Sequence, residues 1–298
     1  MGGTRPTGQA PLCPGPDPAP HGPTRFKAPP GAVDTHAHVI GLPPAYPFVE
    51  GRAYTPPEAT AKSYLNMLDK TGMSHGVLIQ ISVHGSDNRL MVETLHANPQ
   101  RLRGVAVIAP DRPDAEYRAL AEAGVVGLRL NLLYAGGIGL DALERTGALC
   151  KEMGWHLQFL ADARHLPELA PRLSKLPVPF IFDHMGHFPT TDGMSSPCFQ
   201  TLLGLVRDGA WVKLSGAYRT SVARAPYADT LPFARAFIRA APSRCVWGSD
   251  WPHVDLWDQM MNVSDLLDLL ADWGPDEAVR RAILVDNPAR LYGFKPPP

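Results

Sequence analysis

Residues 33–38 read Val33-Asp34-Thr35-His36-Ala37-His38, a short apolar stretch that ends in two histidines one residue apart. Successive side chains of a β-strand point to opposite faces, so the imidazoles of His36 and His38 share one face. Two adjacent imidazoles at a strand end can bind a metal ion or polarise a carbonyl group. Such a pair also occurs as ordinary polar residues of a surface turn. The function of this histidine pair therefore has to be inferred from the rest of the chain.

Length and composition predict one large domain. The chain has 298 residues, of which 45% are hydrophobic and 19% are charged, which suits an α/β barrel of about 250 residues with insertions. The formal net charge of −1 gives no electrostatic footprint for nucleic acid or an anionic membrane. No apolar run is long enough to span a membrane, and residues 1–20 lack a secretory signal. We expect a cytoplasmic protein with a small-molecule substrate and no nucleic-acid or membrane partner, and homo-oligomerisation stays open.

The four cysteines are far apart and include no Cys-x-x-Cys pair. They predict neither a thiolate zinc site nor a disulfide framework.

Residues 1–30 are rich in proline and glycine and nearly free of large apolar side chains. Such a segment can bury little surface, which predicts an extended or disordered arm. The composition favours a tail without a function over a ligand segment for a proline-binding module, and a cover over a neighbouring subunit stays open. Residues 31–298 form the predicted single domain.

From residue 33 onward, short runs rich in β-branched residues alternate with segments of helical period. The predicted strands are residues 32–38, 76–82, 104–109, 127–131, 156–161, 179–184, 211–215 and 244–249. Eight strand–helix repeats in about 250 residues predict a (β/α)8 TIM barrel. An open doubly wound sheet usually carries a glycine-rich phosphate loop after its first strand. Here His-Ala-His and a proline-rich loop occupy that place.

Several helix ends are predicted by capping residues. Thr55-Pro56-Pro57-Glu58 predicts an N-cap at Thr55, and that helix should end at Gly72. Later helical segments should end at Gly124, Gly154 and Gly209.

The active site of a TIM barrel lies at the carboxyl ends of its strands. The polar residues at the predicted strand ends are His36, His38, Gln80, Ser82, Arg129, Asn131, Gln158 or Asp162, Asp183, His184, Ser215 and Asp250. Because the last strand of a barrel pairs with the first, we expect Asp250 beside His36 and His38. Asp250 can instead be only a helix N-cap, and His184 only a loop residue.

Arg129 lies inside a predicted central strand, where a buried guanidinium needs a partner. Carboxylates are sparse near it in the sequence, which predicts an anionic group of the substrate as that partner. His187 and His253 fall near the site, in contact with the substrate or behind the residues that contact it.

Several motifs resemble those of the amidohydrolase superfamily. They are DTHAH (34–38), RAYTPP (52–57), QIS (80–82) with GSDN (85–88), DHMG (183–186), KLSGAYR (213–219), GSDWPH (248–253) and NPARLYG (287–293). The resemblance runs in order from about Val33 to Phe294. It points to the branch that contains 2-pyrone-4,6-dicarboxylate lactonase and sugar-lactone hydrolases.

The resemblance implies a catabolic hydrolase that opens a lactone, and the dicarboxylate lactonase works without a divalent metal. It implies that His36, His38 and His184 polarise the lactone carbonyl while Asp250 takes a proton from water. The residues implied or expected to hold substrate carboxylates or hydroxyls are Arg129, Arg219, Tyr54, Ser82, Gln80 and Asn131.

Two departures from the family pattern bear on substrate and metal. Residues 132–136 supply no second arginine, which favours a mono-acidic or sugar-like lactone over the doubly charged pyrone. The strand-four lysine or glutamate and the strand-five histidine of metal-dependent relatives are also missing, so we expect no binuclear centre and no cofactor. Three imidazoles and the Asp250 carboxylate still suit a single zinc ion.

Three alternatives stay open. They are a mononuclear zinc-dependent hydrolase or decarboxylase of the same superfamily, a lactone isomerase, and a non-catalytic barrel that binds a small molecule.

Overall fold

The computed structural model describes residues 10–257 and 262–295. Eight parallel β-strands follow one another around a single sheet in chain order. They are β1 (Val33–Ala37), β2 (His75–Ile79), β3 (Leu102–Ala106), β4 (Val125–Asn131), β5 (His156–Leu160), β6 (Phe180–Phe182), β7 (Trp211–Leu214) and β8 (Cys245–Trp247). Each overlaps a predicted strand, and the predicted TIM barrel is confirmed.

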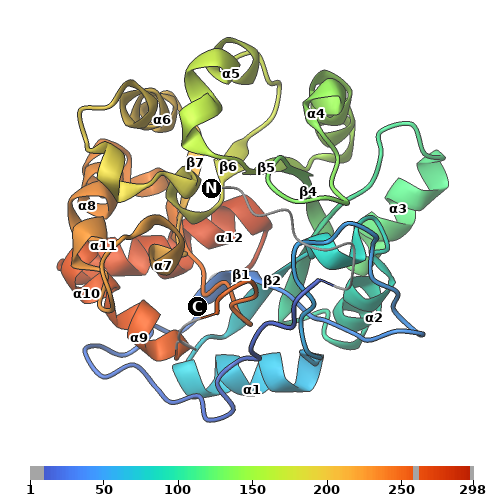
Figure 1. Ribbon diagram of the computed structural model, residues 1–298, viewed down its shortest axis with the longest axis horizontal. Helices are drawn as coiled ribbons and strands as arrows, with labels where there is room; N and C mark the ends of the chain where they lie inside the picture. Colours follow the sequence, from blue (N-terminus) through green and yellow to red (C-terminus); the bar gives the residue numbers. More distant parts are fainter. Residues whose placement is uncertain (1–9, 258–261, 296–298) are drawn as a thin grey trace.

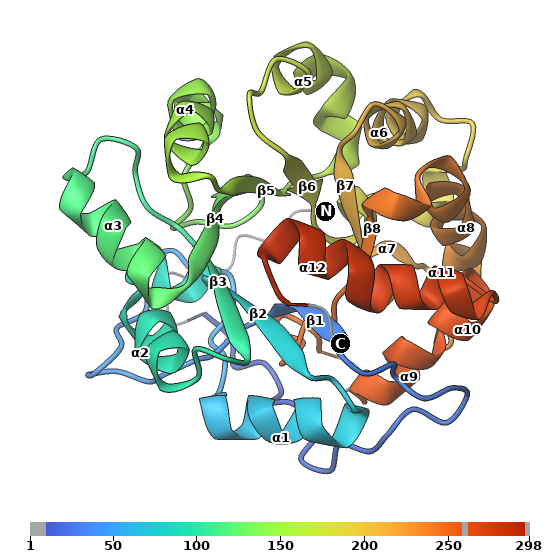
Figure 2. The ribbon, with the colours of Figure 1, turned by 180° about the vertical axis from the view of Figure 1, so that it is seen from behind.

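Helices surround the sheet on its outer side (Figures 1 and 2). They are α1 (Ala61–Thr71), α2 (Arg89–Ala97), α3 (Asp114–Ala123), α4 (Leu143–Met153), α5 (Leu166–Leu173), α6 (Pro197–Arg207), α7 (Ala217–Thr220), α8 (Leu231–Ala240), α9 (Val263–Asp268), α10 (Leu270–Trp273), α11 (Glu277–Arg281) and α12 (Asn287–Tyr292). Among the described residues, no helix is long and apolar enough to cross a membrane.

The barrel closes between β8 and β1. The Thr35 hydroxyl donates to the Trp247 carbonyl at 2.7 Å, and the Asp250 amide donates to the His36 carbonyl at 2.8 Å. At the opposite end, α12 lies across the ring of strands in Figure 2. There Tyr292 packs in one buried cluster with Val33 near the beginning of β1. The carboxyl ends of the strands therefore form the open mouth of the barrel.

The predicted N-cap at Thr55 is wrong, because α1 begins after Thr60. The Thr60 hydroxyl accepts a hydrogen bond from the Ser63 amide. The Thr55 amide instead donates to the Pro11 carbonyl at 2.7 Å, and the Cys13 amide donates to the Thr55 carbonyl at 3.0 Å. Long-range pairing with the N-terminal arm has replaced the local cap.

Glycines end three of the predicted helices. Gly72, Gly124 and Gly154 cap α1, α3 and α4 with left-handed backbones at φ 78°, 100° and 69°, which confirms those three ends. Helix α6 has Asp208 as its C-cap and Gly209 at the next position with φ 120°, which confirms the predicted glycine after its end.

The described part of the arm, residues 10–30, runs along the outside of the barrel (Figure 1). The Cys13 side chain is buried, and Phe26 packs against the core. The amides of Thr24 and Arg25 both donate to the Asp268 carboxylate of α9. The prediction for residues 1–9 lies outside the described residues.

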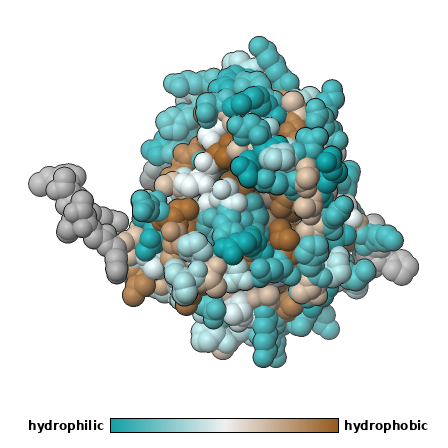
Figure 3. Space-filling view, turned by 90° about the vertical axis from the view of Figure 1, so that its right-hand side faces the viewer, coloured by the Kyte–Doolittle hydropathy of each residue, from teal (hydrophilic) through white to brown (hydrophobic). Residues whose placement is uncertain are grey.

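The face drawn in Figure 3 is mostly hydrophilic, with hydrophobic residues scattered among polar ones. Scattered apolar residues are ordinary for a solvated protein surface.

Candidate active site

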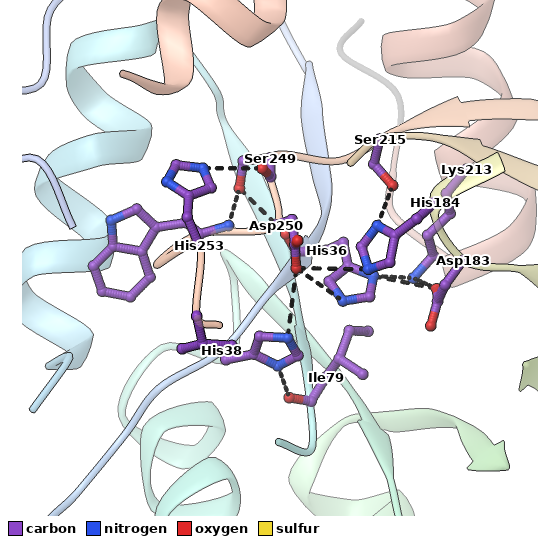
Figure 4. A network of polar contacts seen from close by, with 12 residues as sticks. His36, His38, Ile79, Asp183, His184, Lys213, Ser215, Ser249, Asp250 and His253 are labelled. Carbon is purple, nitrogen blue, oxygen red and sulfur yellow. Dashed lines mark hydrogen bonds and ion pairs between the residues drawn. The ribbon is translucent and has the colours of Figure 1, made fainter. Parts of the chain in front are cut away.

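The structure brings His36, His38, His184 and Asp250 together at the mouth of the barrel (Figure 4). The Asp250 Oδ1 atom lies 3.7 Å from His36 Nε2, 3.8 Å from His38 Nε2 and 3.6 Å from His184 Nε2. All four side chains are buried. Three ring nitrogens from β1 and the end of β6 therefore face one oxygen of the residue that follows β8.

Two of these residues have an unusual backbone. His184 and Asp250 are left-handed, with φ of 49° and 62°, a region that few non-glycine residues occupy outside functional sites. His184 comes two residues after the end of β6, and Asp250 three residues after the end of β8. The turn directs each side chain into the mouth rather than along the strand.

The hydrogen bond of His38 fixes its tautomer. His38 Nδ1 lies 2.8 Å from the Ile79 carbonyl oxygen, which only accepts, so Nδ1 carries the hydrogen. Burial lowers the pKa of His38 to about 3, so the ring is neutral and its Nε2 is an acceptor. A neutral His38 in this tautomer cannot polarise a carbonyl, which departs from the role expected for it.

His184 and His36 are not constrained in this way. His184 Nδ1 lies 2.9 Å from Ser215 Oγ, a hydroxyl that can donate or accept. His36 Nδ1 lies 3.2 Å from both Asp183 Oδ1 and Lys213 Nζ. Burial lowers the pKa of His36 to about 4 and that of His184 well below its ordinary value. Both rings are neutral, and each can carry its hydrogen on Nε2.

The second oxygen of Asp250 is held by two donors. The Tyr218 hydroxyl donates to Oδ2 at 2.6 Å, and Arg219 Nε donates to the same atom at 2.5 Å. Burial alone would raise the pKa of Asp250, but the Arg219 guanidinium and the facing imidazoles hold it well below its ordinary value. Asp250 is therefore ionised, with Oδ1 directed at the three histidines.

His38, His184, Arg219 and Asp250 border a narrow cavity of about 20 Å³, which is space for about one water molecule in this arrangement of side chains. Its wall consists of His38, Tyr54, Ile81, Ser82, Arg129, Tyr134, Leu160, His184, His187, Arg219, Asp250 and Val254. The Tyr54 hydroxyl lies 3.1 Å from Ser82 Oγ. Four predicted binding residues, Tyr54, Ser82, Arg129 and Arg219, therefore lie in the wall.

Two other predicted binding residues do not line the cavity. The Gln80 amide donates to the Gly85 and Asp87 carbonyls at 3.1 and 2.9 Å. Asn131 Oδ1 accepts from the backbone amides of residues 133 and 134 at 3.1 and 3.0 Å. Both side chains hold loops in shape, which explains their polar character at strand ends.

The prediction that Arg129 lacks a carboxylate partner is wrong. Its Nη2 lies 3.3 Å from Asp183 Oδ2, at the end of β6. The sequence could not show this, because the two residues belong to different strands. Arg129 Nε is nevertheless buried without a hydrogen-bond partner among the described residues, so the guanidinium keeps a donor available in the cavity wall.

Sequence reasoning assigned no role to three residues of the site. Lys213 is buried in β7 beside His36, and its place in an otherwise apolar strand was a usable signal. Tyr218 lay inside a recognised motif but was not connected with Asp250. Tyr134, whose hydroxyl donates to Asp255 at 3.0 Å, lies in a loop that gave no signal.

The residue types also fit a single metal ion. Ligand atoms of His36, His184 and Asp250 all lie within 4.8 Å of one another. His36 Nε2 has no hydrogen-bond partner among the described residues. Neutral imidazoles and a carboxylate are ligands that zinc prefers. Bound there, zinc would supply Lewis-acid polarisation of a carbonyl oxygen.

Several known proteins resemble this chain in sequence and in fold. The profile of the family described as Amidohydrolase matches residues 33–294. 4-Sulfomuconolactone hydrolase of Hydrogenophaga intermedia is 39% identical over 279 residues, which are 91% of this chain and 91% of the relative. 2-Pyrone-4,6-dicarboxylate hydrolase of Comamonas testosteroni is 35% identical over 280 residues, covering 90% and 92%.

D-galactarolactone isomerase of Agrobacterium fabrum is 31% identical over 273 residues, covering 90% of this chain and 93% of the relative. A solved structure from Agrobacterium tumefaciens aligns with a TM-score of 0.85 at 30% identity, over 93% of this chain and 98% of the other. The resemblance drawn from the sequence motifs is confirmed.

Proposed function

Because this chain belongs to the amidohydrolase family, we propose that it is a hydrolase that opens the ring of a lactone, a cyclic ester. Two relatives that match it over nine-tenths of their length are named as lactone hydrolases. One observation carries the proposal: three imidazole Nε2 atoms face a single oxygen of the ionised Asp250, beside a cavity that His38, His184 and Asp250 line.

The attacking water is activated by acceptors. Asp250 Oδ1 and His38 Nε2 both accept hydrogen bonds and lie 3.8 Å apart, so a water between them would donate to both. Asp250 takes one proton as the water oxygen bonds to the lactone carbonyl carbon. A positioned carboxylate base contributes typically ~10²–10⁴-fold to the rate.

The carbonyl oxygen gains negative charge in this step and needs donors. His36 and His184 can present Nε2–H groups to it, since their Nδ1 atoms have partners that allow this tautomer. Preorganised donors of this kind are worth a few kcal/mol each. When the intermediate collapses, the ring C–O bond breaks and the protonated Asp250 returns its proton to the leaving oxygen. The product is an open hydroxy acid.

Two guanidinium groups in the cavity wall favour an anionic substrate. Arg129 and Arg219 line the cavity and pair with Asp183 and Asp250, and Arg129 Nε has no hydrogen-bond partner among the described residues. A substrate carboxylate in contact with these groups would accept charge-assisted hydrogen bonds. We propose a reaction on a lactone with an acidic group and, because the strand-four and strand-five metal ligands of metal-dependent relatives are missing, a reaction without a metal ion.

Two second candidates have specific support. A mononuclear zinc enzyme is favoured because the ligand atoms of His36, His184 and Asp250 lie within 4.8 Å of one another. The relative named as a lactone isomerase favours isomerisation, in which a substrate hydroxyl replaces water as the nucleophile. The same base and donors would serve that reaction.

A panel of acidic and sugar lactones, assayed with and without a chelator, separates these candidates. We expect ring opening that survives chelation. Loss on chelation with recovery on adding zinc would establish the zinc enzyme instead, and formation of an isomeric lactone would establish the isomerase. Binding without turnover across the panel would show a non-catalytic barrel.

Asp250→Asn tests the base. Asparagine tolerates the left-handed backbone that Asp250 has at φ 62°, so the variant should fold. We expect kcat to fall by about 10²–10⁴-fold, with the melting temperature as the folding control. A folded variant with wild-type turnover would remove Asp250 from the mechanism.

A further inference from the structure

Lys213 is an ammonium group at the centre of the barrel. It belongs to β7, its side chain is 0% exposed, and it lies beside His36 and Asp183 (Figure 4). Its Nζ lies 2.8 Å from Gln158 Oε1, 3.2 Å from Asp183 Oδ1 and 3.2 Å from His36 Nδ1. Lysine is almost never fully buried unless each of its charges and donors is matched.

His36 Nδ1 lies between two groups of opposite character. Asp183 Oδ1 can only accept a hydrogen bond, whereas the Lys213 ammonium can only donate. If Nδ1 carries the hydrogen, it donates to Asp183 and leaves a bare Nε2. If Nδ1 accepts from Lys213, the hydrogen sits on Nε2, which lies 3.7 Å from Asp250 Oδ1.

The contacts favour the second arrangement. The Lys213 contact with Nδ1 has the geometry of a hydrogen bond. Asp183 Oδ1 has no hydrogen-bond partner among the described residues, so its approach to Nδ1 is electrostatic. Lys213 Nζ has two neighbours in hydrogen-bond geometry, Gln158 Oε1 and His36 Nδ1, and forms an ion pair with Asp183 Oδ1; His36 Nδ1 accepts from it only when Nδ1 carries no hydrogen.

Asp183 does not need the His36 hydrogen. Its Oδ2 accepts from Gln158 Nε2 at 3.0 Å and faces Arg129 Nη2 at 3.3 Å. Both carboxylate oxygens therefore have cationic or N–H neighbours without it.

We propose that Lys213 is a positioning residue that holds His36 in the tautomer with hydrogen on Nε2, so that His36 donates to the lactone carbonyl oxygen. This inference rests on the proposed function. It also explains how a site with metal-ligand residue types works as a hydrogen-bond donor site, since the Nε2–H tautomer has no lone pair on that atom for a metal. Without Lys213, His36 would donate from Nδ1 to Asp183 and present a bare Nε2 beside His184 and Asp250.

Lys213→Met tests the proposal, because methionine fills similar space and cannot donate. We expect kcat to fall by about 10²-fold, the loss typical of one oxyanion donor, with KM changed little. We also expect the variant to bind zinc at least about tenfold more tightly than the wild type in calorimetric titrations, since metal ligation needs a bare nitrogen. The control is Gln158→Met, which removes another Lys213 partner and one donor to Asp183 but keeps the contact of Lys213 with His36.

The tautomer itself is read from ¹⁵N chemical shifts of the imidazoles, with His36 assigned by its absence in His36→Gln. We expect a protonated Nε2 in the wild type and in Gln158→Met, and a protonated Nδ1 in Lys213→Met. A protonated Nδ1 in the wild type overturns the proposal, as does a Lys213→Met variant with wild-type kcat and spectrum. If Lys213→Met does not fold, the wild-type spectrum still decides. If no lactone is opened, the proposed function is wrong. The ¹⁵N spectrum still shows whether Lys213 sets the tautomer of His36.

Discussion

Gly248 follows β8 at the point where the chain passes closest to His36. A Cβ at this position would lie 2.7 Å from His36 Cβ and 3.0 Å from His36 N. Ordinary contacts begin at 3.4 Å, so Gly248→Ala lacks about 0.7 Å of space. Neither atom belongs to the flexible end of a side chain. The His36 backbone is also held in place, because its carbonyl accepts a hydrogen bond from the Asp250 amide at 2.8 Å.

Two effects of the alanine can be given magnitudes. Overpacking of a rigid core costs about 1–3 kcal/mol of unfolding free energy. Displacement of a catalytic group by close to 1 Å costs up to about 10²-fold in rate. We therefore expect Gly248→Ala to lower kcat/KM by about 10–100-fold.

Gly204→Ala is the matched control, since it makes the same chemical change where space exists. Gly204 lies inside α6, and a Cβ there would meet nothing within 4 Å. Alanine favours a helix over glycine by about 0.5–1 kcal/mol, so this variant should be slightly more stable, with wild-type activity. Thermal unfolding and steady-state lactone opening compare the two. A folded Gly248→Ala with wild-type kcat/KM would refute the reasoning that the position of His36 limits the reaction.

Two further predictions concern pH and the arm. Burial lowers the pKa of His36 to about 4 and that of His38 to about 3, so both rings gain charge only as the pH falls through those values. We expect kcat/KM to be flat from about pH 5 to 7, below the value of about 8 to which burial lowers the pKa of Lys213, and an inflection near the ordinary histidine pKa of about 6.5 would contradict neutral rings. Asp268 accepts from the Thr24 amide, the Thr24 hydroxyl and the Arg25 amide at 2.9, 2.7 and 3.0 Å. Asp268→Ala should lower the free energy of unfolding in urea by about 2 kcal/mol, and an unchanged midpoint would show that the arm does not stabilise the barrel.

The barrel could be predicted because its signal is local and repeated. A strand that is buried on both faces reads as a short apolar run, whatever it pairs with. The end of a strand is less visible, since an apolar pattern can continue after the ladder of hydrogen bonds has stopped. Residues 80–82 continue the predicted second strand, yet β2 ends at Ile79.

Features that depend on distant partners were missed or misread. Thr55 has the local pattern of a helix N-cap, and only its pairing with Pro11 reveals its different position. Arg129 has few carboxylates near it in the sequence, and its partner Asp183 comes from another strand. The meeting of Asp250 with His36 is also long-range, but closure of a barrel requires it, so topology supplied what the local sequence lacked.

The two hydrogen bonds that Asp250 Oδ2 accepts from Tyr218 and Arg219 determine whether Asp250 is the better base or the better acid. Burial raises the pKa of this carboxyl, but the charge of Arg219 is the largest of the effects that hold it well below its ordinary value. By Brønsted behaviour, such a carboxylate is a weak base, but its protonated form is a strong acid. These two donors therefore slow the removal of a proton from water by Asp250 and speed the return of that proton to the leaving oxygen. The leaving group of an ester departs as an oxyanion and needs a proton. The rate gained in ring opening therefore offsets the rate lost in the attack of water, provided that His36 and His184 stabilise the tetrahedral intermediate.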